Sequence, residues 1–449
     1  MNFSRLGHER ALQACAPEVA DVVSMTHDGR GVARIAGKTV FVDGALEGES
    51  VSFVRTRVRR SYDEARLDSV LVNSPERVTP RCAYFGTCGG CSLQHLASGR
   101  QLELKQRVLL DNLERIGGVR PRELLEPVTG PEWGYRRRAR LGVKRVEKKG
   151  RVLVGFRERA KSYVADMLRC EVLAPPMDAL IEPLSTLIGS LGIRGKIPQI
   201  EVAAGDAATA LVLRVLAEPS AADRQVLREF AARHGVDFHL QSAGLDSVRP
   251  LDEPARPLSY SLPRFGLTLE FLPTDFVQVN AEVNRRLVGL VVDLLAPRAN
   301  DRVLDLFCGL GNFTLPLARG ASAVTGVDGD AGLIGRAKAN AARNGLGNVR
   351  FARADLCEAH AAATWAREPA DLVLLDPPRA GAAELIAAGV AGNARRIVYV
   401  SCHPASLARD AGTLTREHGF ELTAAGIADM FPHTAHVESI AVFDAAGKR

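Results

Sequence analysis

The sequence predicts an α/β protein in three parts, and three patterns along the chain support this fold class. From about residue 266 onward, strand-like and helix-like segments alternate, which is typical of a mostly parallel, Rossmann-like sheet covered by helices. Residues 10–74 contain several short strand-like segments, which predict a small barrel. Residues 75–265 mix strands and helices and predict a central α+β domain. A chain of 449 residues has room for this division, with the last domain at residues 266–449.

Charge is distributed unevenly along the chain. Lys and Arg total 58 and Asp and Glu total 52, so the net charge is +6. Residues 1–170 carry 31 basic and 20 acidic side chains, a net +11, and the remaining 27 and 32 give −5. This asymmetry predicts that the basic part binds nucleic acid. The composition, 46% hydrophobic and 24% charged, argues against a disordered protein.

The sequence contains no segment expected to span a membrane. The most apolar stretch, Leu287 to Pro297, is interrupted by Asp293 and is too short. The first twenty residues lack the apolar region of a secretory signal. We therefore expect a cytoplasmic protein whose thiols stay reduced.

The first segment predicts a barrel of the OB type. Strand-like segments of four to eight residues are separated by turns at Asp28-Gly29, Ala36-Gly37, Asp43-Gly44 and Glu47-Gly48. Such barrels often bind single-stranded nucleic acid. One strand-like run contains Arg55, Arg57, Arg59 and Arg60. This run favours an RNA-binding barrel over a purely structural one.

The central domain begins with clustered cysteines. Cys82, Cys88 and Cys91 lie close together and Cys170 lies far downstream. Four thiolates are suited to zinc or to an iron–sulfur cluster. Zinc ribbons usually use two close pairs, so three clustered cysteines and one distant one favour a cubane cluster. The remaining Cys15, Cys308 and Cys357 are expected to be unliganded.

Two further patterns describe the central domain. Residues 93–118 predict a helix that ends at Gly117-Gly118, and residues 93–124 are candidates to pack with the last domain. Residues 133–161 contain twelve Lys or Arg and two Glu, with aromatic Trp133, Tyr135 and Phe156 among them. Cations for phosphates and aromatic rings for stacking predict contact with RNA. A solvated charged face would usually balance the two signs.

The first motif of the expected cofactor site in the last domain lies at residues 303–318. A buried strand is followed by a turn with Asp305, Gly309 and Gly311, and then by a helix. A Gly-rich first turn lets a nucleotide-like ligand approach the backbone. The third glycine of the dinucleotide fingerprint is absent, so S-adenosylmethionine suits this turn better than a pyrophosphate.

Three more acids follow the next three strands. Asp328 follows the second strand, where a carboxylate can bind ribose hydroxyls, and Asp355 follows the third, near an expected adenine. Asp376 follows the fourth strand. Any one of them could be a helix cap or a turn residue. Four acids at successive strand ends favour a shared ligand site.

A candidate nucleophile and a candidate base complete this edge. Cys402 follows the fifth strand, before Pro404 begins a helix whose dipole would favour the thiolate. Near a last strand lie His433, His436 and Glu438, of which the carboxylate is the candidate general base. The alternatives are a buried structural cysteine, a solvated glutamate and structural histidines.

A thiol, a carboxylate and a methyl donor together suggest one reaction. Carbon 5 of a pyrimidine is a poor nucleophile until a thiolate adds to carbon 6 and turns the ring into an enolate. Carbon 5 then takes the methyl group, a base removes its proton and the thiolate leaves. The target base must first leave any stack.

Taken together, these motifs resemble the RNA 5-methyluridine methyltransferase family over nearly the whole chain. The motifs are the barrel, similar to a TRAM domain, and CAYFGTCGGCSLQH, FLPTDFVQVN, DLFCGLGNFTLPLA, LLDPPRAG, VSCHPASLARD and MFPHTAHVES. The resemblance implies methylation of carbon 5 of a uridine in 23S rRNA, at uridine 1939. It also implies Cys402 as nucleophile and Glu438 as proton acceptor.

The resemblance implies two ligand sets as well. A 4Fe–4S cluster would be held by Cys82, Cys88, Cys91 and Cys170. S-adenosylmethionine would be bound by Gln278, Phe307, Asn312, Asp328, Asp355 and Asp376. The chain departs from the family pattern at His403, usually Asn or Asp, and at Asp328, often Glu. His403 could alter the pKa of the adjacent thiol.

The resemblance also sets expectations about partners. We expect a monomer that binds 23S rRNA and neither DNA nor a membrane. Methylation of tRNA, a non-catalytic RNA-binding role and a redox role are the alternatives. The cluster cysteines argue against the tRNA enzymes of proteobacteria, and Cys402 with Glu438 argues against a non-catalytic role.

Overall fold

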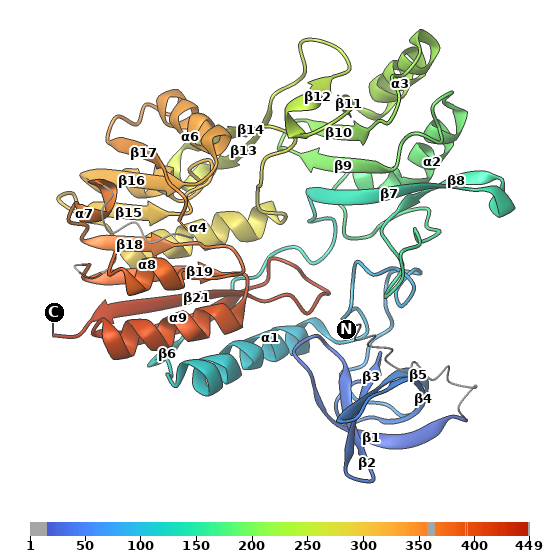
Figure 1. The fold of residues 1–449 in the computed structure, drawn as a ribbon, viewed down its shortest axis with the longest axis horizontal. Helices are drawn as coiled ribbons and strands as arrows, with labels where there is room; N and C mark the ends of the chain where they lie inside the picture. Colours follow the sequence, from blue (N-terminus) through green and yellow to red (C-terminus); the bar gives the residue numbers. More distant parts are fainter. Residues whose placement is uncertain (1–15, 357–363, 391, 393, 448–449) are drawn as a thin grey trace, which may run out of the picture. The chain divides into compact units, whose positions relative to one another are not determined.

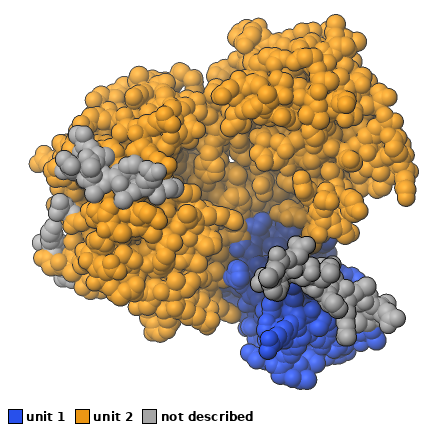
Figure 2. Space-filling view, viewed as in Figure 1, with its two compact units in different colours: residues 1–86, 91–104, 433–435 blue, residues 87–90, 105–432, 436–449 orange. Residues whose placement is uncertain are grey.

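The computed structural model describes residues 16–356, 364–390, 392 and 394–447 (Figure 1). The chain divides into two compact units (Figure 2). We call residues 1–86, 91–104 and 433–435 the barrel unit, and residues 87–90, 105–432 and 436–449 the main unit. Each unit is described by itself.

The barrel unit contains a closed five-stranded barrel, as the sequence predicts. The strand order is β1-β2-β3-β5-β4, with β3 and β5 parallel and the other neighbours antiparallel. The strands are β1 (Glu18–Met25), β2 (Gly31–Ile35), β3 (Lys38–Asp43), β4 (Ser50–Val58) and β5 (Tyr62–Val72). Their inward side chains, among them Val22, Val40 and Phe53, form the core. All four predicted turns contain a glycine with positive φ, the conformation in which glycine avoids strain.

One arginine of the predicted RNA-binding run is part of the barrel's own structure. Asp63 is fully buried, and its carboxylate pairs with Arg55 and, at 2.6 Å, with Nζ of Lys38. Arg55 also binds Glu18, with 2.6 Å between Nε and Oε1. Arg57, Arg59 and Arg60 are exposed. At least Arg55 of this run is therefore bound within the barrel itself.

The predicted helix at residues 93–118 is confirmed but begins later. It consists of α1 (Ser98–Asn112) and one wider helical turn at Leu113–Gly117. Gly118 ends it in the left-handed conformation, with φ of 65°. In the main unit, a guanidinium N–H of Arg416 donates to the carbonyl of Gly117 at 2.7 Å.

A six-stranded mixed sheet forms the middle of the main unit. Its strand order is β12-β11-β10-β9-β7-β8, and only β10 and β11 are parallel neighbours. The strands are β7 (Arg138–Val146), β8 (Arg151–Gly155), β9 (Gln199–Ala204), β10 (Thr209–Arg214), β11 (Val236–Gln241) and β12 (Val248–Pro250). Two helices, α2 (Ile181–Ser190) and α3 (Ala221–His234), accompany the sheet, and β13 (Leu258–Leu262) pairs with β14 (Leu267–Phe271).

An eight-stranded sheet forms the rest of the main unit, with the order β17-β16-β15-β18-β19-β21-β20-β6 (Figure 1). The first five are parallel, as predicted, and β21 is antiparallel to both neighbours. The strands are β15 (Arg302–Leu306), β16 (Ala323–Asp328), β17 (Val349–Arg353), β18 (Leu372–Leu375), β19 (Arg396–Ser401), β20 (Phe420–Ala428) and β21 (Glu438–Ala445). The edge strand β6 comes from Glu123–Leu124, far earlier in the chain.

Six helices of the described chain accompany this sheet. They are α4 (Ala281–Leu295), α5 (Thr314–Ala318), α6 (Ala331–Arg343), α7 (Thr364–Arg367), α8 (Ala383–Ala387) and α9 (Pro404–Glu417). The central strands β15, β18 and β19 are almost wholly buried, as expected for parallel strands covered on both faces, whereas the edge strand β17 has no buried residue. Within the described residues, no helix is both long enough and apolar enough to cross a membrane.

Candidate active site

The first strand of the parallel sheet ends in a tightly built turn. Asp305 is fully buried, and its Oδ2 accepts a hydrogen bond of 2.5 Å from Thr314 Oγ1. Burial raises the pKa of Asp305 to about 7. Phe307, Gly309 and Gly311 follow with φ of 67°, 55° and 95°. A methyl group added at Gly309 would meet no atom within 4 Å, so the backbone there is open to a ligand.

The other three acids lie at or just beyond strand ends. Asp328 ends β16, and its carboxylate accepts the backbone N–H of Gly309 at 3.0 Å and of Asp330 at 2.8 Å. Asp355 lies two residues beyond β17 and is exposed. Asp376 directly follows β18 and is half-buried, and burial raises its pKa to about 7. Because β15 to β18 are parallel, these acids lie along one edge of the sheet.

One residue suggested only by the family resemblance, Asn312, makes hydrogen bonds with two buried side chains next to this edge. Oδ1 of Asn312 accepts the hydroxyl of Tyr260 at 2.9 Å and an amide N–H of Asn284 at 3.0 Å. Asn312 returns an amide N–H to Asn284 at 3.0 Å. Gln278 lines a small cavity that Tyr260 and Asn284 also line. Gln278 lies in an irregular segment, so neither spacing nor periodicity marks it.

Cys402 and Glu438 lie at adjoining ends of two antiparallel neighbours, because Cys402 directly follows β19 and Glu438 is the first residue of β21. In the β19–β21 pair, Val400 lies opposite Ile440 and Ser401 opposite Ser439. The next position in this register brings Cys402 opposite Glu438, although 36 residues separate them in the chain. Directly opposite residues in such a pair have side chains within about 4.5–5.5 Å of each other at Cβ. Glu438 is 4% exposed, which excludes a solvated strand-edge glutamate.

The electrostatics of this pair differ from the sequence expectation. Burial, and then the charge of Asp376, raise the pKa of Glu438 to about 8. Burial and the nearby carboxylates of Glu438 and Asp376 also raise the pKa of the Cys402 thiol, while Arg379 lowers it. The sequence predicts a helix dipole that favours the thiolate, and the net shift of the Cys402 pKa is nevertheless upward, because burial and repulsion by the two carboxylates raise it.

His403 has a structural contact of its own. It is the N-cap of α9, and its Nδ1 accepts the backbone N–H of Ser406 at 3.3 Å. The Ser406 hydroxyl lies 2.8 Å from the same nitrogen and donates to the carbonyl of Arg379 at 2.6 Å. An Asn or Asp at this position would be an ordinary N-cap, so the substitution preserves the capping contact.

The two histidines near the last strand belong to different units. His433 lies in the barrel unit, where its backbone N–H donates to Oε1 of Gln101 at 2.9 Å. His436 lies in the main unit, with Nδ1 3.5 Å from Nη2 of Arg379. Burial and surrounding positive charges lower the pKa of His436 to about 4. With a pKa that low, His436 is a weak base near neutral pH.

The four predicted cluster cysteines are divided between the units. Cys82 and Cys91 belong to the barrel unit, and Cys88 and Cys170 to the main unit. Cys88 and Cys170 are buried, and the Cys88 sulfur accepts the backbone N–H of Gly90 at 3.4 Å. Among the residues that the structure describes, no group of three or more His, Cys, Asp or Glu side chains is arranged to hold a metal ion. Cys308 is buried, whereas Cys15 and Cys357 lie outside the described residues.

The basic run at residues 133–161 is less available than its composition suggests. Several of its cations contact carboxylates from elsewhere in the fold: Arg137 with Asp206, Arg140 with Glu201, and Lys149 and Arg151 with Asp166. Arg138 donates instead to the carbonyl of Pro273. The sequence count of positive charge therefore overstates what RNA could reach.

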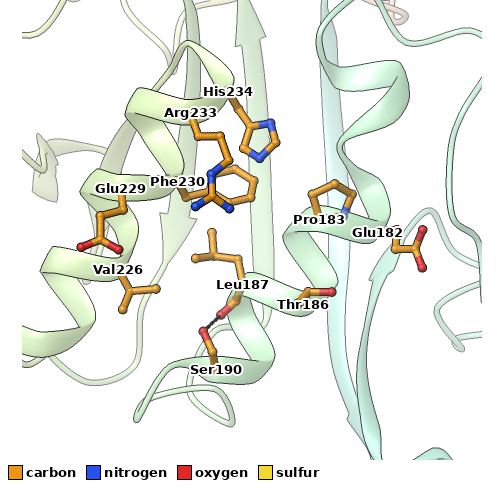
Figure 3. Close-up of a pocket in the computed structure, with 10 residues that line it drawn as sticks. All are labelled: Glu182, Pro183, Thr186, Leu187, Ser190, Val226, Glu229, Phe230, Arg233 and His234. Carbon is orange, nitrogen blue, oxygen red and sulfur yellow. Dashed lines mark hydrogen bonds between the residues drawn. The ribbon is translucent and has the colours of Figure 1, made fainter.

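A cavity of about 510 Å³ lies between α2 and α3 (Figure 3). Glu182 and Leu187 line it from α2, and Phe230, Arg233 and His234 from α3. None of the site residues predicted from the sequence lines this cavity. It is therefore not the site formed by the strand ends.

Comparisons with known proteins agree on one chemistry. The family described as tRNA (Uracil-5-)-methyltransferase matches residues 266–445. A 23S rRNA (uracil(1939)-C(5))-methyltransferase RlmD from Stenotrophomonas maltophilia is 53% identical over 431 residues, 95% of this chain and 97% of the relative. A protein of the same name from Methylococcus capsulatus is 50% identical over 442 residues, 98% of this chain and 100% of the relative.

A solved structure shares the fold. The Pyrococcus abyssi tRNA (uracil-54, C5)-methyltransferase, crystallised with S-adenosyl-L-homocysteine, superposes with a TM-score of 0.72 at 23% identity. The match covers 95% of this chain and 100% of the other. The predicted methyltransferase fold of the last domain is thereby confirmed.

Proposed function

This chain belongs to the family of RNA uracil-C5 methyltransferases, and on that premise we propose that it methylates carbon 5 of a specific uridine in 23S rRNA, uridine 1939 in the numbering of its relatives. It is an S-adenosylmethionine-dependent enzyme, like the relatives that match it over nearly their whole length. The observation that supports the proposal is the position of Cys402 directly after β19 and of Glu438 at the start of the neighbouring β21, where the Glu438 carboxylate acts electrostatically on the Cys402 thiol.

In the proposed mechanism, Cys402 is the nucleophile and Glu438 the general base. The Cys402 sulfur adds to carbon 6 of the uracil ring, and the electron pair of the 5,6 double bond makes carbon 5 nucleophilic. Carbon 5 would then take the methyl group of S-adenosylmethionine, whose methyl–sulfur bond would break to leave S-adenosylhomocysteine. Glu438 takes the proton from carbon 5, the double bond re-forms and the carbon–sulfur bond breaks to release the Cys402 thiolate.

The raised pKa values suit the two halves of this cycle. A carboxylate with a pKa of about 8 is a stronger base than an ordinary glutamate, so it removes a carbon-bound proton more readily. The neighbouring acids raise the pKa of the Cys402 thiol and so disfavour the reactive thiolate. The positive charge of Arg379 lowers this pKa and so favours the thiolate. Once Glu438 has taken a proton, its repulsion of the departing thiolate is removed, which favours release.

We assign S-adenosylmethionine binding to Gln278, Phe307, Asn312, Asp328, Asp355 and Asp376. The open backbone at Gly309 and the carboxylates at successive strand ends support this assignment. Asp328 would bind the ribose hydroxyls and Asp355 the adenine. Because Oδ1 of Asn312 already accepts two hydrogen bonds, we propose that Asn312 acts through its remaining amide N–H or by shaping the turn.

We also propose that Cys82, Cys88, Cys91 and Cys170 hold a 4Fe–4S cluster. The donor set suits the group, because four thiolates are its usual ligands. The Gly90 N–H bonded to the Cys88 sulfur is the kind of contact that stabilises a charged thiolate. The cluster would supply a structural crosslink or an electron-transfer centre. As-isolated anaerobic protein that contains zinc but neither iron nor sulfide would contradict this assignment.

The proposed partner is 23S rRNA, bound in part by the barrel and the central domain. Exposed Arg57, Arg59 and Arg60 of the barrel support RNA contact. A cytoplasmic location, a monomeric state and the absence of DNA or membrane partners remain predictions. So do the domain boundaries at residues 74 and 265.

Purified protein incubated with labelled S-adenosylmethionine, unmodified 23S rRNA and, separately, unmodified tRNA tests the proposal. We expect label on one uridine of 23S rRNA, carried as 5-methyluridine after digestion. Cys402→Ala is the matched negative control. Transfer to tRNA alone would move the assignment to the tRNA enzymes, and no transfer to either RNA would overturn it.

A further inference from the structure

Side chains of α9 hold the loop of residues 376–382, which connects β18 to α8 and which we call the Arg379 loop. The Ser406 hydroxyl donates to the carbonyl of Arg379 at 2.6 Å. Nη2 of Arg409 donates to the carbonyl of Ala380 at 2.8 Å. Because residues three apart lie on one face of a helix, both bonds come from the same face of α9. The loop is therefore bound to α9 at two consecutive carbonyls.

A third contact binds the Arg379 loop to a buried carboxylate. Oδ2 of Asp410, on α9, accepts the backbone N–H of Ala382 at 2.8 Å and the hydroxyl of Tyr399 at 2.7 Å. Asp410 and Tyr399 are both buried, and Tyr399 belongs to β19. A methyl group added at Gly381 would lie 2.6 Å from the same oxygen, so a glycine is needed where the loop approaches α9. Asp410 thus joins the loop to both α9 and β19.

Ser406 is the uncharged member of these three α9 side chains. It is buried, and the Arg379 carbonyl accepts the single proton of its hydroxyl. The hydroxyl oxygen also lies 2.8 Å from Nδ1 of His403, the N-cap of α9. Because Cys402 directly precedes His403, the Ser406 hydroxyl connects the chain next to the proposed nucleophile with the backbone of Arg379.

Two charged residues of the Arg379 loop act on the Cys402 thiol in opposite directions. Asp376, like Glu438 on β21, raises the pKa of the thiol, whereas Arg379 lowers it. Asp376 directly follows β18, and its backbone N–H donates to the carbonyl of Leu306 on β15 at 3.3 Å. The sheet therefore places Asp376. Arg379 lies three residues farther along, where the contacts with α9 place the backbone.

We propose that Ser406 is a positioning residue, whose hydroxyl holds the backbone of Arg379 against α9 and so fixes the distance between the guanidinium and the Cys402 sulfur. This inference rests on the proposed function, in which Cys402 is the nucleophile. The interaction of two charges weakens as their separation grows. A loop released from α9 would therefore stabilise the thiolate less, although no charge has been removed.

Ionisation of the Cys402 thiol tests this proposal in the full chain. We would measure alkylation of Cys402 by iodoacetamide between pH 6 and pH 10 and quantify the modified peptide by mass spectrometry. Ser406→Ala should raise the thiol pKa by about 0.5, a fraction of the roughly 1 to 3 pKa units that a nearby opposite charge contributes. At pH values well below the pKa, alkylation should then slow about threefold, because only the thiolate reacts.

A second substitution shows whether the effect passes through Arg379. In an Arg379→Gln background, Ser406→Ala should cause no further rise in the thiol pKa. Thr415→Ala is the matched control, because it removes another α9 hydroxyl, which donates to the carbonyl of Ala411 within the helix at 3.0 Å. It should leave the thiol pKa unchanged. A purely structural role of Ser406 would lower the thermal stability and leave the thiol pKa at its parental value.

Ser406→Ala should fold, since alanine is the better helix former, and thermal unfolding verifies this. Arg409→Lys takes its place otherwise: it keeps the positive charge of an exposed side chain, shortens its reach to the Ala380 carbonyl and should also raise the thiol pKa. An unchanged thiol pKa in the folded variant, or an equal rise with and without the Arg379 side chain, would overturn the inference. A parent protein that methylates no RNA would overturn the proposed function, whereas normal methylation with an unchanged thiol pKa in the variant would overturn this inference alone.

Discussion

The basic run at residues 133–161 and the acidic edge of the eight-stranded sheet differ in whether their charges are paired. In the run, Arg137, Arg140 and Arg151 find carboxylates contributed by other segments. At the sheet edge, burial raises the pKa values of Asp376, Glu438 and Cys402, and repulsion by neighbouring carboxylates raises those of Glu438 and Cys402 further. Opposite charges that pair help to stabilise the fold. Like charges held close together shift the pKa values of acids, bases and nucleophiles, as active sites require.

The largest expected effect is the loss of the nucleophile at the acidic edge. Cys402→Ala should reduce turnover by at least about 10⁴-fold, because covalent activation of carbon 5 is lost. It should also abolish the denaturation-resistant adduct with 5-fluorouridine RNA, seen as a band shift on a denaturing gel. Cys308→Ala, which changes a buried cysteine outside the pair, should keep the adduct. An adduct that survives in Cys402→Ala would show that another residue is the nucleophile.

Removing the base should separate two steps of the reaction. Glu438→Gln should slow turnover by about 10²- to 10⁴-fold yet still form the methylated adduct, which would accumulate. It should also lower the pKa of the Cys402 thiol, because one neighbouring negative charge is gone. Alkylation of Cys402 by iodoacetamide at several pH values measures that shift. A thiol pKa equal to that of the parent would mean that the two groups do not interact.

The pH dependence of single-turnover methylation follows from the same repulsion. Glu438 must be ionised to accept a proton, and its pKa is raised to about 8. The rate should therefore rise from pH 6 through pH 8 as Glu438 ionises, and it should go on rising above pH 8 because the pKa of the Cys402 thiol is raised as well. In Glu438→Gln this rise should disappear or move. A parent rate that is flat between pH 6 and pH 8 would contradict the raised pKa.

A smaller effect concerns stability at the acidic edge. A carboxyl group whose folded-state pKa is raised contributes most at low pH, and its contribution is lost as pH rises through the folded pKa. For Asp376 this loss spans from its ordinary pKa near 3.8 to about 7. Asp376→Asn should therefore increase the free energy of unfolding at pH 8 by about 1 kcal/mol, while it impairs activity. Thermal unfolding at pH 5 and pH 8 measures this, and the gain should be smaller at pH 5.

The smallest effect belongs to an exposed pair of the basic run. Arg140→Gln breaks the contact with Glu201, but the arginine side chain is 70% exposed. Such pairs contribute about 0 to 1 kcal/mol, so the free energy of unfolding should hardly change. Chemical denaturation checks this. A loss comparable to that expected for breaking the buried Lys105–Asp429 pair, about 3–5 kcal/mol, would show that the run is a structural element.

Much of the fold could be predicted because it depends on local patterns. Short strands between Gly-containing turns indicated the barrel, and alternating strands and helices indicated the parallel sheet. Asp328 and Asp376 were found because parallel strands bring their carboxyl ends to one edge. Gln278 and Asn312 were not found from the residues, because an irregular segment and a single amide have no periodicity to mark them.

The sequence by itself determined which chemical groups this protein has and their order along the chain. These groups are a thiol after one strand, a carboxylate at the start of another, and acids at the ends of four parallel strands. Only the tertiary structure decided which of them interact. The antiparallel pairing of β19 with β21 brings the end of one strand, before Cys402, next to the start of the other, at Glu438. Acids from other segments pair with four cations of the basic run, Arg137, Arg140, Lys149 and Arg151. The physical reason is that pairing and desolvation depend on distance in space, so both a pKa and an available charge are properties of the folded chain.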